Sequence, residues 1–170
     1  MRADAIVLPG VGAFEACAKA LISRNLHSIL NEVVIGRKKP ILGICVGMQL
    51  MATESEENGL HLGLNWIPGR VLRLKLPESY AVPHVGWNQL TEVGASPLFS
   101  KTPDGPHFYF DHNFHYLCDP EYVSAQCDYG KPIVAAVQRD HIHGVQFHPE
   151  KSQNNGLKLF RAFFDMVAKC

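Results

Sequence analysis

The chain has 170 residues, 46% of them apolar and 19% charged, and its 16 basic and 16 acidic residues cancel. This balance is typical of a globular protein, and the length predicts one domain over residues 1–170 with a sizeable core. The neutral charge gives no electrostatic reason to bind nucleic acid or an anionic membrane, and no apolar run is long enough to cross a membrane.

The first 53 residues alternate short apolar runs with helical patterns. The runs at residues 5–8 and 40–44 predict buried strands. The stretches at 14–23 and 26–35 predict helices, and the second of these ends at a glycine. The run at 40–44 leads straight into a cysteine, after which residues 46–53 form another predicted helix.

The rest of the chain is richer in strand patterns. Residues 71–76 alternate apolar and polar side chains, as a half-exposed strand does, and residues 156–168 predict an amphipathic closing helix. Further strands are expected at 82–88, 108–111, 123–127, 133–138 and 142–146. Arg139-Asp140 suits a hairpin turn between the last two. Together these elements predict an α/β fold with a mainly parallel sheet and an antiparallel extension.

A possible nucleophile lies between the second strand and the helix that follows it. Gly43 and Gly47 flank Cys45 in the pattern G-x-C-x-G. A sharp strand-to-helix turn brings neighbouring backbone close, so small residues are needed on both sides of a nucleophile there. The backbone N–H of Val46 would then point toward an oxyanion. A buried structural cysteine beside two packing glycines is the alternative for this pattern taken alone.

A candidate base and its orienting carboxylate follow the strand at 142–146. Alternate residues at a strand end point the same way, so His148 and Glu150 can lie on one side. An imidazole near a thiol serves as base and then acid, while a carboxylate fixes its tautomer. Taken alone, the pattern H-x-E is more often structural.

Two further features support a site at Cys45. Gly10 and Gly12 follow the first strand, where glycines permit a close backbone approach to a ligand and a second oxyanion donor. Gln49 lies one helical turn after Cys45 and on the same face, where it can bind a polar substrate. An ordinary turn and a solvated helix position are the alternatives.

These motifs together resemble those of class I (triad) glutamine amidotransferases, which have a flavodoxin-like three-layer fold. The resemblance rests on residues 9–14, 43–49 and 146–152. Residues 83–88, and more loosely residues 109–114, are similar to the glutaminase subunits of imidazole glycerol phosphate synthase in histidine biosynthesis.

The resemblance implies that Cys45, His148 and Glu150 hydrolyse glutamine to glutamate and ammonia without a metal or organic cofactor. It also implies that Gln49 and the backbone around Asn113 and Phe114 hold the amino-acid end of the substrate.

The family resemblance also implies a partner, a (β/α)8-barrel synthase or cyclase subunit that receives the ammonia. Trp87 and Lys151 resemble residues of that interface. Core packing is the alternative for Trp87, and a solvated position is the alternative for Lys151.

The sequence departs from the family in two places. Members usually carry a βαβ unit before the segment at 9–14, so we expect a truncation, a misassigned start or a replacement of that unit by another chain. Residues 111–115 differ from the commoner family version. A sibling glutaminase that supplies ammonia for amidination of a surface-polysaccharide sugar is therefore an alternative, as are a peptide-cleaving cysteine hydrolase and a non-catalytic binding subunit.

The cysteines also bear on where the protein works. Five of them are scattered along the chain without a C-x-x-C pair, which does not favour a zinc site or a secreted disulfide framework. The N-terminus does not resemble a signal peptide. A reduced, cytoplasmic protein is the resulting prediction.

Overall fold

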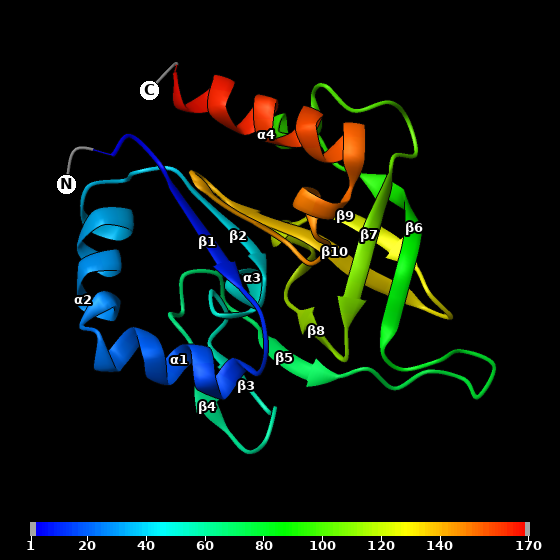
Figure 1. The fold of residues 1–170 in the computed structure, drawn as a ribbon, viewed down its shortest axis with the longest axis horizontal. Helices are drawn as coiled ribbons and strands as arrows, with labels where there is room; N and C mark the ends of the chain where they lie inside the picture. The colour runs from blue at the N-terminus through cyan, green and yellow to red at the C-terminus, as the bar shows by residue number, and fades with distance from the viewer. Residues whose placement is uncertain (1–2, 169–170) are drawn as a thin grey trace.

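The computed structural model describes residues 3–168, in which two β-sheets are combined with α-helices (Figure 1). The larger sheet has seven strands. In spatial order they are β1 (Ile6–Gly10), β2 (Ile41–Cys45), β11 (Ile142–Val145), β10 (Pro132–Arg139), β9 (Val123–Asp128), β6 (His84–Val93) and β7 (His107–His112).

The larger sheet is mixed, as the α/β prediction requires. β2 pairs in parallel with both β1 and β11. Among the described residues, the other four pairings of this sheet, from β11 across to β7, are antiparallel. The parallel core and the antiparallel extension are therefore both present, and the extension is the larger part. Hairpins account for much of it, because short loops can join only antiparallel neighbours.

Strand β2 lies at the centre of the parallel part. All five of its residues are buried, because β1 and β11 flank it and both sheet faces are covered; this is why its sequence is apolar without alternation. Ile44 is in register with Val145 of β11. Cys45 at the end of β2 and the residues after β11 therefore emerge at the same edge of the sheet.

The smaller sheet borders this edge. Its strands, in spatial order, are β4 (His61–Leu62), β3 (Glu54–Ser55), β5 (Arg70–Arg73) and β8 (Phe114–Leu117). The chain passes from β7 of the larger sheet to β8 of the smaller one at Asn113, whose carbonyl accepts a hydrogen bond of 2.8 Å from Leu74 N–H. The 111–114 segment is thereby held where the two sheets meet.

Helices cover the larger sheet from two sides. Figure 1 shows the first two helices beside the N-terminal strands and the closing helix on the opposite side, which gives three layers. The helices are α1 (Phe14–Ser23), α2 (Leu26–Asn31) with its π-helical continuation Glu32–Gly36, α3 (Val46–Gln49) and α4 (Gln153–Val167). Single 3₁₀ turns lie at Pro97–Phe99, Pro120–Tyr122 and Pro149–Lys151.

The prediction of a helix over 46–53 was too long. α3 ends at Gln49, and the backbone groups beyond it bond to a distant segment instead. The carbonyls of Leu50, Met51 and Ala52 accept hydrogen bonds from residues 64–67. This long-range pairing replaces the next helical turn, and no local pattern in the sequence announces it.

Strand boundaries differ from the sequence predictions at both ends of the middle region. β6 extends to Val93, beyond the expected end at residue 88, and β5 stops at Arg73. Strands β3, β4 and β8 were missed because the first two have two residues each and the third follows β7 after one residue. The hairpin at residues 139–140 is confirmed, with Asp140 at φ 53° in the turn.

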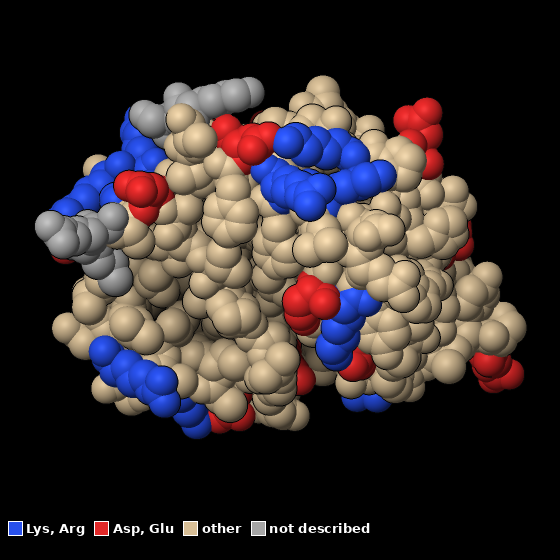
Figure 2. Space-filling view, turned by 45° about the horizontal axis from the view of Figure 1, so that its top comes forward, with Lys and Arg blue, Asp and Glu red and all other residues tan. Residues whose placement is uncertain are grey.

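The surface shown in Figure 2 is largely uncharged, with acidic and basic side chains in separate small groups. No helix within residues 3–168 combines the length and the apolar character that a membrane crossing requires.

Candidate active site

Cys45 sits at a sharp turn between β2 and α3. Its backbone has φ 53° and ψ −112°, in a region that residues with a side chain rarely adopt. At this turn Cys45 lines a polar cavity at the edge of the sheet. The backbone at Cys45 is thus strained, as in a sharp strand-to-helix turn that carries a nucleophile.

The two flanking glycines are required by close backbone contacts. A Cβ on Gly47 would lie 1.8 Å from the carbonyl oxygen of Leu8, and one on Gly43 would lie 2.7 Å from the carbonyl oxygen of Gly47. Gly10 belongs to the same packing, since a Cβ there would lie 2.8 Å from Gly47 N. Gly10 therefore supports the turn from behind and is not among the residues that line the cavity, whereas Gly12 is.

The Cys45 thiol is buried, with 6% of the residue exposed. Burial raises the pKa of this thiol to about 11, a hydrogen bond from the Val46 backbone N–H lowers it, and the charges of Asp111 and Glu150 raise it further. Lys151 opposes them and lowers the pKa. In the isolated protein the sulfur is therefore protonated near neutral pH and needs a base to become a nucleophile.

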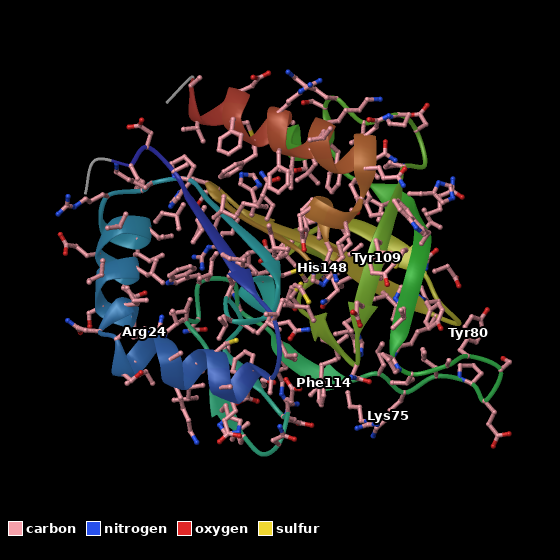
Figure 3. All side chains as sticks on the ribbon, viewed as in Figure 1. Arg24, Lys75, Tyr80, Tyr109, Phe114 and His148 are labelled. Atoms are coloured by element: carbon pink, nitrogen blue, oxygen red, sulfur yellow. The ribbon has the colours of Figure 1, made fainter. Side chains whose placement is uncertain are left out.

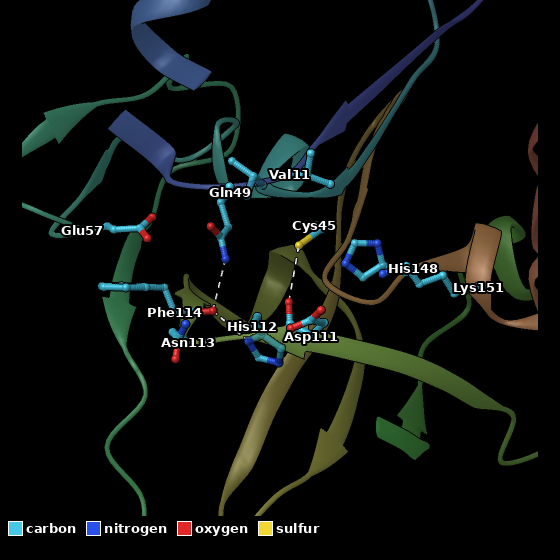
Figure 4. A pocket seen from close by; sticks show the side chains of 12 residues that line it. Val11, Cys45, Gln49, Glu57, Asp111, His112, Asn113, Phe114, His148 and Lys151 are labelled. Carbon is cyan, nitrogen blue, oxygen red and sulfur yellow. Dashed lines mark hydrogen bonds between the residues drawn. The ribbon is translucent and has the colours of Figure 1, made fainter. Parts of the chain in front are cut away.

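His148 lies beside this thiol, three residues after β11. Figure 4 shows its ring on the cavity wall next to Cys45. Its Nδ1 lies 2.6 Å from Glu150 Oε1. Because a carboxylate only accepts, Nδ1 carries the proton and the free Nε2 is an acceptor. This arrangement suits a general base.

The backbone of His148 is fixed from β7. Its N–H donates to the Tyr109 carbonyl at 2.8 Å, and its carbonyl accepts from Ser152 Oγ at 2.6 Å. Ser152 Oγ in turn accepts from Tyr109 N–H at 3.0 Å. These bonds hold His148 and Tyr109 together near the centre of the molecule (Figure 3).

The cavity around Cys45 has a volume of about 290 Å³, enough for a small amino acid. It brings together predicted site residues from four distant segments: Gly12, Cys45, Val46, Gln49, Asn113, Phe114, His148 and Lys151. Glu150 stands behind His148 and is half-exposed. These residues are far apart in the sequence but meet in the cavity because the ends of β2 and β11 lie at the same edge of the sheet.

A buried pair of amide side chains lies at the cavity, and Gln49 of this pair lines it. Gln49 Nε2 donates to the Phe114 carbonyl and to Gln146 Oε1, both at 3.1 Å. Gln146 Nε2 approaches the Cys45 sulfur at 3.8 Å. Gln49 is thus buried and held in place, which excludes the alternative of a solvated helix position.

Trp87 and Lys151 both contact the Tyr109 ring at the rim of the cavity. The Trp87 and Tyr109 rings stand edge to face with centroids 6.1 Å apart, and Lys151 Nζ lies 5.5 Å from the Tyr109 centroid. Trp87 is 49% exposed, which excludes core packing. We call Val85, Trp87, Tyr109 and Lys151 the rim patch. It combines the exposed apolar side chains of Val85 and Trp87 with the partly buried Tyr109 ring and the Lys151 cation.

Sequence reasoning missed two acidic residues of the cavity. Glu57 lines it and accepts a hydrogen bond of 2.8 Å from the Phe14 N–H at the start of α1. Asp111 lines it near Cys45. Glu57 lies in an acidic run with no feature to single it out, and Asp111 was noted within a motif but given no role. Among residues 3–168, His, Cys, Asp and Glu side chains form no group suited to a metal.

Comparisons with known proteins identify the family of this chain. A family model described as glutamine amidotransferase class-I matches residues 2–167. Imidazole glycerol phosphate synthase subunit HisH 2 of Vibrio vulnificus is 47% identical over 165 residues, covering 97% of this chain and 77% of that protein. Imidazole glycerol phosphate synthase subunit HisH of Rhodopseudomonas palustris is 48% identical over 168 residues, covering 95% and 78%.

A solved structure shows the same fold. The crystal structure of a putative GMP synthase protein from Thermoplasma acidophilum matches with a TM-score of 0.71 at 22% identity, covering 99% of this chain and 74% of that one.

Proposed function

Because this chain belongs to the class-I glutamine amidotransferase family, we propose that it hydrolyses glutamine to glutamate and ammonia through Cys45, His148 and Glu150. The observation that carries this proposal is that Cys45 and His148 line the same cavity, while Glu150 Oε1 lies 2.6 Å from the Nδ1 atom of His148.

The chemistry follows from the positions of these groups. His148 Nε2 takes the thiol proton as Cys45 Sγ bonds to the carboxamide carbon of glutamine, and the carbonyl electrons move onto oxygen. Backbone N–H groups at Val46 and near Gly12 are suited to hold this oxyanion. The C–N bond then breaks, and ammonia leaves with the proton from His148.

The resulting glutamyl thioester is hydrolysed by the same base. Water gives a proton to His148 and attacks the thioester carbon, the C–S bond breaks, and the thiolate is reprotonated. Glu150 supports the imidazolium that forms in each half of the cycle. The products are glutamate and free enzyme.

The other end of the cavity suits the amino-acid end of glutamine. Gln49, Asn113 and Phe114 line it, and the carboxylate of Glu57 adds a negative charge. A carboxylate there attracts the substrate's α-ammonium group. This charge also favours free glutamine over the same side chain inside a peptide, which has no such ammonium.

We further propose that the ammonia passes to a (β/α)8-barrel synthase or cyclase subunit that makes imidazole glycerol phosphate in histidine biosynthesis. The relatives named as subunits of that synthase support this assignment. The rim patch supports docking next to the site, because it exposes Trp87 beside the cavity mouth. A cytoplasmic location is consistent with four free cysteines among the described residues.

The test is glutamate release from glutamine by the chain with its barrel partner, compared with the Cys45→Ala variant. We expect release that the partner's nucleotide-like ligand stimulates and that Cys45→Ala abolishes. Release by Cys45→Ala would refute the triad. Activity on peptides, or binding without any turnover, would instead support a peptide hydrolase or a non-catalytic subunit. Stimulation only by a sugar-amidating partner would reassign the acceptor.

A further inference from the structure

Two buried histidines, of which His112 lines the cavity, have no part in the proposed triad chemistry. His84 of β6 and His112 of β7 are 2% and 5% exposed. His84 Nδ1 lies 2.9 Å from His112 Nε2, and His112 Nδ1 lies 2.8 Å from the Phe114 carbonyl oxygen. His84 is also stacked on Phe110 and Tyr129, with centroids 4.7 Å and 3.9 Å away. Both rings are thus fixed in position.

The donor and the acceptor in the bond between His84 and His112 follow from the Phe114 carbonyl, which can only accept. The Phe114 carbonyl only accepts, so His112 Nδ1 carries a proton. In a neutral ring His112 Nε2 is then an acceptor, and His84 Nδ1 must be the donor to it. His84 Nε2 is left as an acceptor in turn.

Asn88, next to His84 at the end of the chain of bonds far from Phe114, supplies the donor that the acceptor His84 Nε2 requires. Asn88 Oδ1 accepts the Gln89 N–H at 2.8 Å, which fixes the orientation of the amide. Asn88 Nδ2 therefore faces the other way, where it donates to the Asp128 carbonyl at 2.8 Å and approaches His84 Nε2 at 3.3 Å. Each polar atom from Asn88 to Phe114 thus has one consistent role.

At its other end the chain of bonds reaches the cavity, which Phe114 and Gln49 line. The Phe114 carbonyl accepts from His112 and also from Gln49 Nε2 at 3.1 Å. Both lone pairs of this carbonyl are therefore used, so it serves as an anchor and is not free to bind substrate. Through Gln49 and Gln146 the chain of bonds ends at the Cys45 sulfur.

We propose that His84 and His112 are positioning residues that fix the 113–114 segment and Gln49 for glutamine binding, through hydrogen bonds that converge on the Phe114 carbonyl from His112 and from Gln49. The proposal rests on the glutaminase function proposed above. His84 lies on the buried side of β6, opposite the exposed Trp87. Its role in this proposal is to hold in place the residues that bind the amino-acid end of the substrate.

The chain of bonds requires both rings to be neutral. Protonation of either histidine would set two N–H groups face to face across 2.9 Å or remove the acceptor for Asn88. Burial lowers the pKa of His84 to about 3 and that of His112 to about 4, and each is lowered further by a neighbouring imidazole, His112 for His84 and His148 for His112. The titratable and charged groups that face this pair are Asp111, His115, Tyr129 and His148, and Lys131 lies beside His115.

The first test is independent of catalysis. Long-range ¹H–¹⁵N correlation spectra of the whole protein report the tautomer of each imidazole. We expect both His84 and His112 to carry the proton on Nδ1 and to remain neutral down to about pH 5. An Nε2–H tautomer for His112, or protonation of either ring near its ordinary pKa of about 6.5, would overturn the proposal.

The second test uses paired substitutions. An Asn side chain places its amide nitrogen near the Nδ1 position of histidine, whereas Gln places it near Nε2. We expect His112→Gln and His84→Gln to raise the KM for glutamine about tenfold, the effect of losing roughly one buried hydrogen bond, with a smaller change in kcat. His112→Asn and His84→Asn should restore most of the loss.

Each result of these substitutions supports or refutes a positioning role for His84 and His112. A wild-type KM in the Gln variants, or equal losses with Asn and Gln, would refute a positioning role. If the Gln variants do not fold, the spectra of the wild-type protein still decide. A wild-type protein that releases no glutamate would refute the proposed function, while the tautomers would stand as an independent result.

Discussion

The Cys45 thiol donates a long hydrogen bond, 3.9 Å, to the backbone carbonyl of Asp111, whose side chain also lines the cavity. The thiol therefore rests in its protonated form beside a carboxylate that disfavours the thiolate. Lys151 on the rim acts in the opposite direction. The reactivity of the sulfur is set by the balance of these charges as well as by burial.

Substitution of Asp111 should change this balance. Asp111→Asn removes a negative charge and lowers the Cys45 pKa, so more thiolate is present at a given pH. We expect alkylation of Cys45 by iodoacetamide at about pH 8 to become about threefold faster, which corresponds to roughly half a pKa unit. Mass spectrometry of the Cys45 peptide measures the rate. Cys118, which lies outside the cavity, is the internal control and should be unchanged.

The Glu150 carboxylate should matter for turnover more than for binding. Glu150→Gln keeps the size of the side chain but removes the charge that supports the His148 imidazolium. We expect kcat to fall roughly 10- to 100-fold, less than for a fully buried carboxylate because solvent reaches this half-exposed one. Steady-state kinetics with glutamine measures it. An unchanged kcat would remove Glu150 from the mechanism.

The turn at Cys45 should be intolerant of a single methyl group at Gly47. Gly47→Ala would bring a Cβ to 1.8 Å from the Leu8 carbonyl, so we expect the free energy of unfolding to fall by about 3–5 kcal/mol. Gly36→Ala is the matched control, since no atom beyond its chain neighbours and its own helix backbone lies within 4 Å of the added Cβ. That variant should differ from the wild type by less than about 1 kcal/mol, as measured by urea unfolding.

The rim patch should contribute to partner binding. Trp87→Ala removes an exposed aromatic side chain next to the cavity, and we expect the Kd for the barrel subunit to rise at least about tenfold. Phe164→Ala on α4 is the control, because Phe164 is 52% exposed and distant in the fold. Calorimetry measures both. Equal effects of the two substitutions would argue against docking at the rim patch.

Acid should destabilise the protein through its buried histidines. Burial lowers the pKa of four of them, to about 3 for His84 and about 4 for His112, His115 and His143. In the unfolded chain these groups titrate near about 6.5. Between about pH 6.5 and about pH 4 the unfolded state therefore binds more protons, and the free energy of unfolding must fall as the pH falls.

The size of this effect can be measured one residue at a time. Each histidine contributes up to about 1.4 kcal/mol per pH unit. His143→Leu should reduce the slope of unfolding free energy against pH by one such contribution, because it removes one histidine whose pKa burial lowers. The substitution breaks no hydrogen bond at Nδ1, which is buried without a partner. The same slope in this variant and the wild type would contradict the assignment.

Local patterns predicted most of the elements and part of the cavity lining, including Cys45, Gln49 and His148, whereas Asn113, Phe114 and Lys151 were implied by the family resemblance. The G-x-C-x-G turn and the closing helix could be found because spacing and small residues report short-range geometry. The length of α3 could not, because Leu64 and its neighbours take the carbonyls that would continue it. Glu57 and the His84–His112 pair could not be found for the same reason, since they reach the site only through long-range pairing.

The register of Ile44 with Val145 has a consequence for how such proteins diverge. It means that backbone hydrogen bonds between β2 and β11 bring the sulfur and the imidazole to the same edge of the sheet, before any side chain holds the ring. A slip by one residue would displace the base by roughly 3.3 Å and turn it to the other face. Much of the surrounding sequence can then differ while the fold is kept, as in the solved structure that is 22% identical.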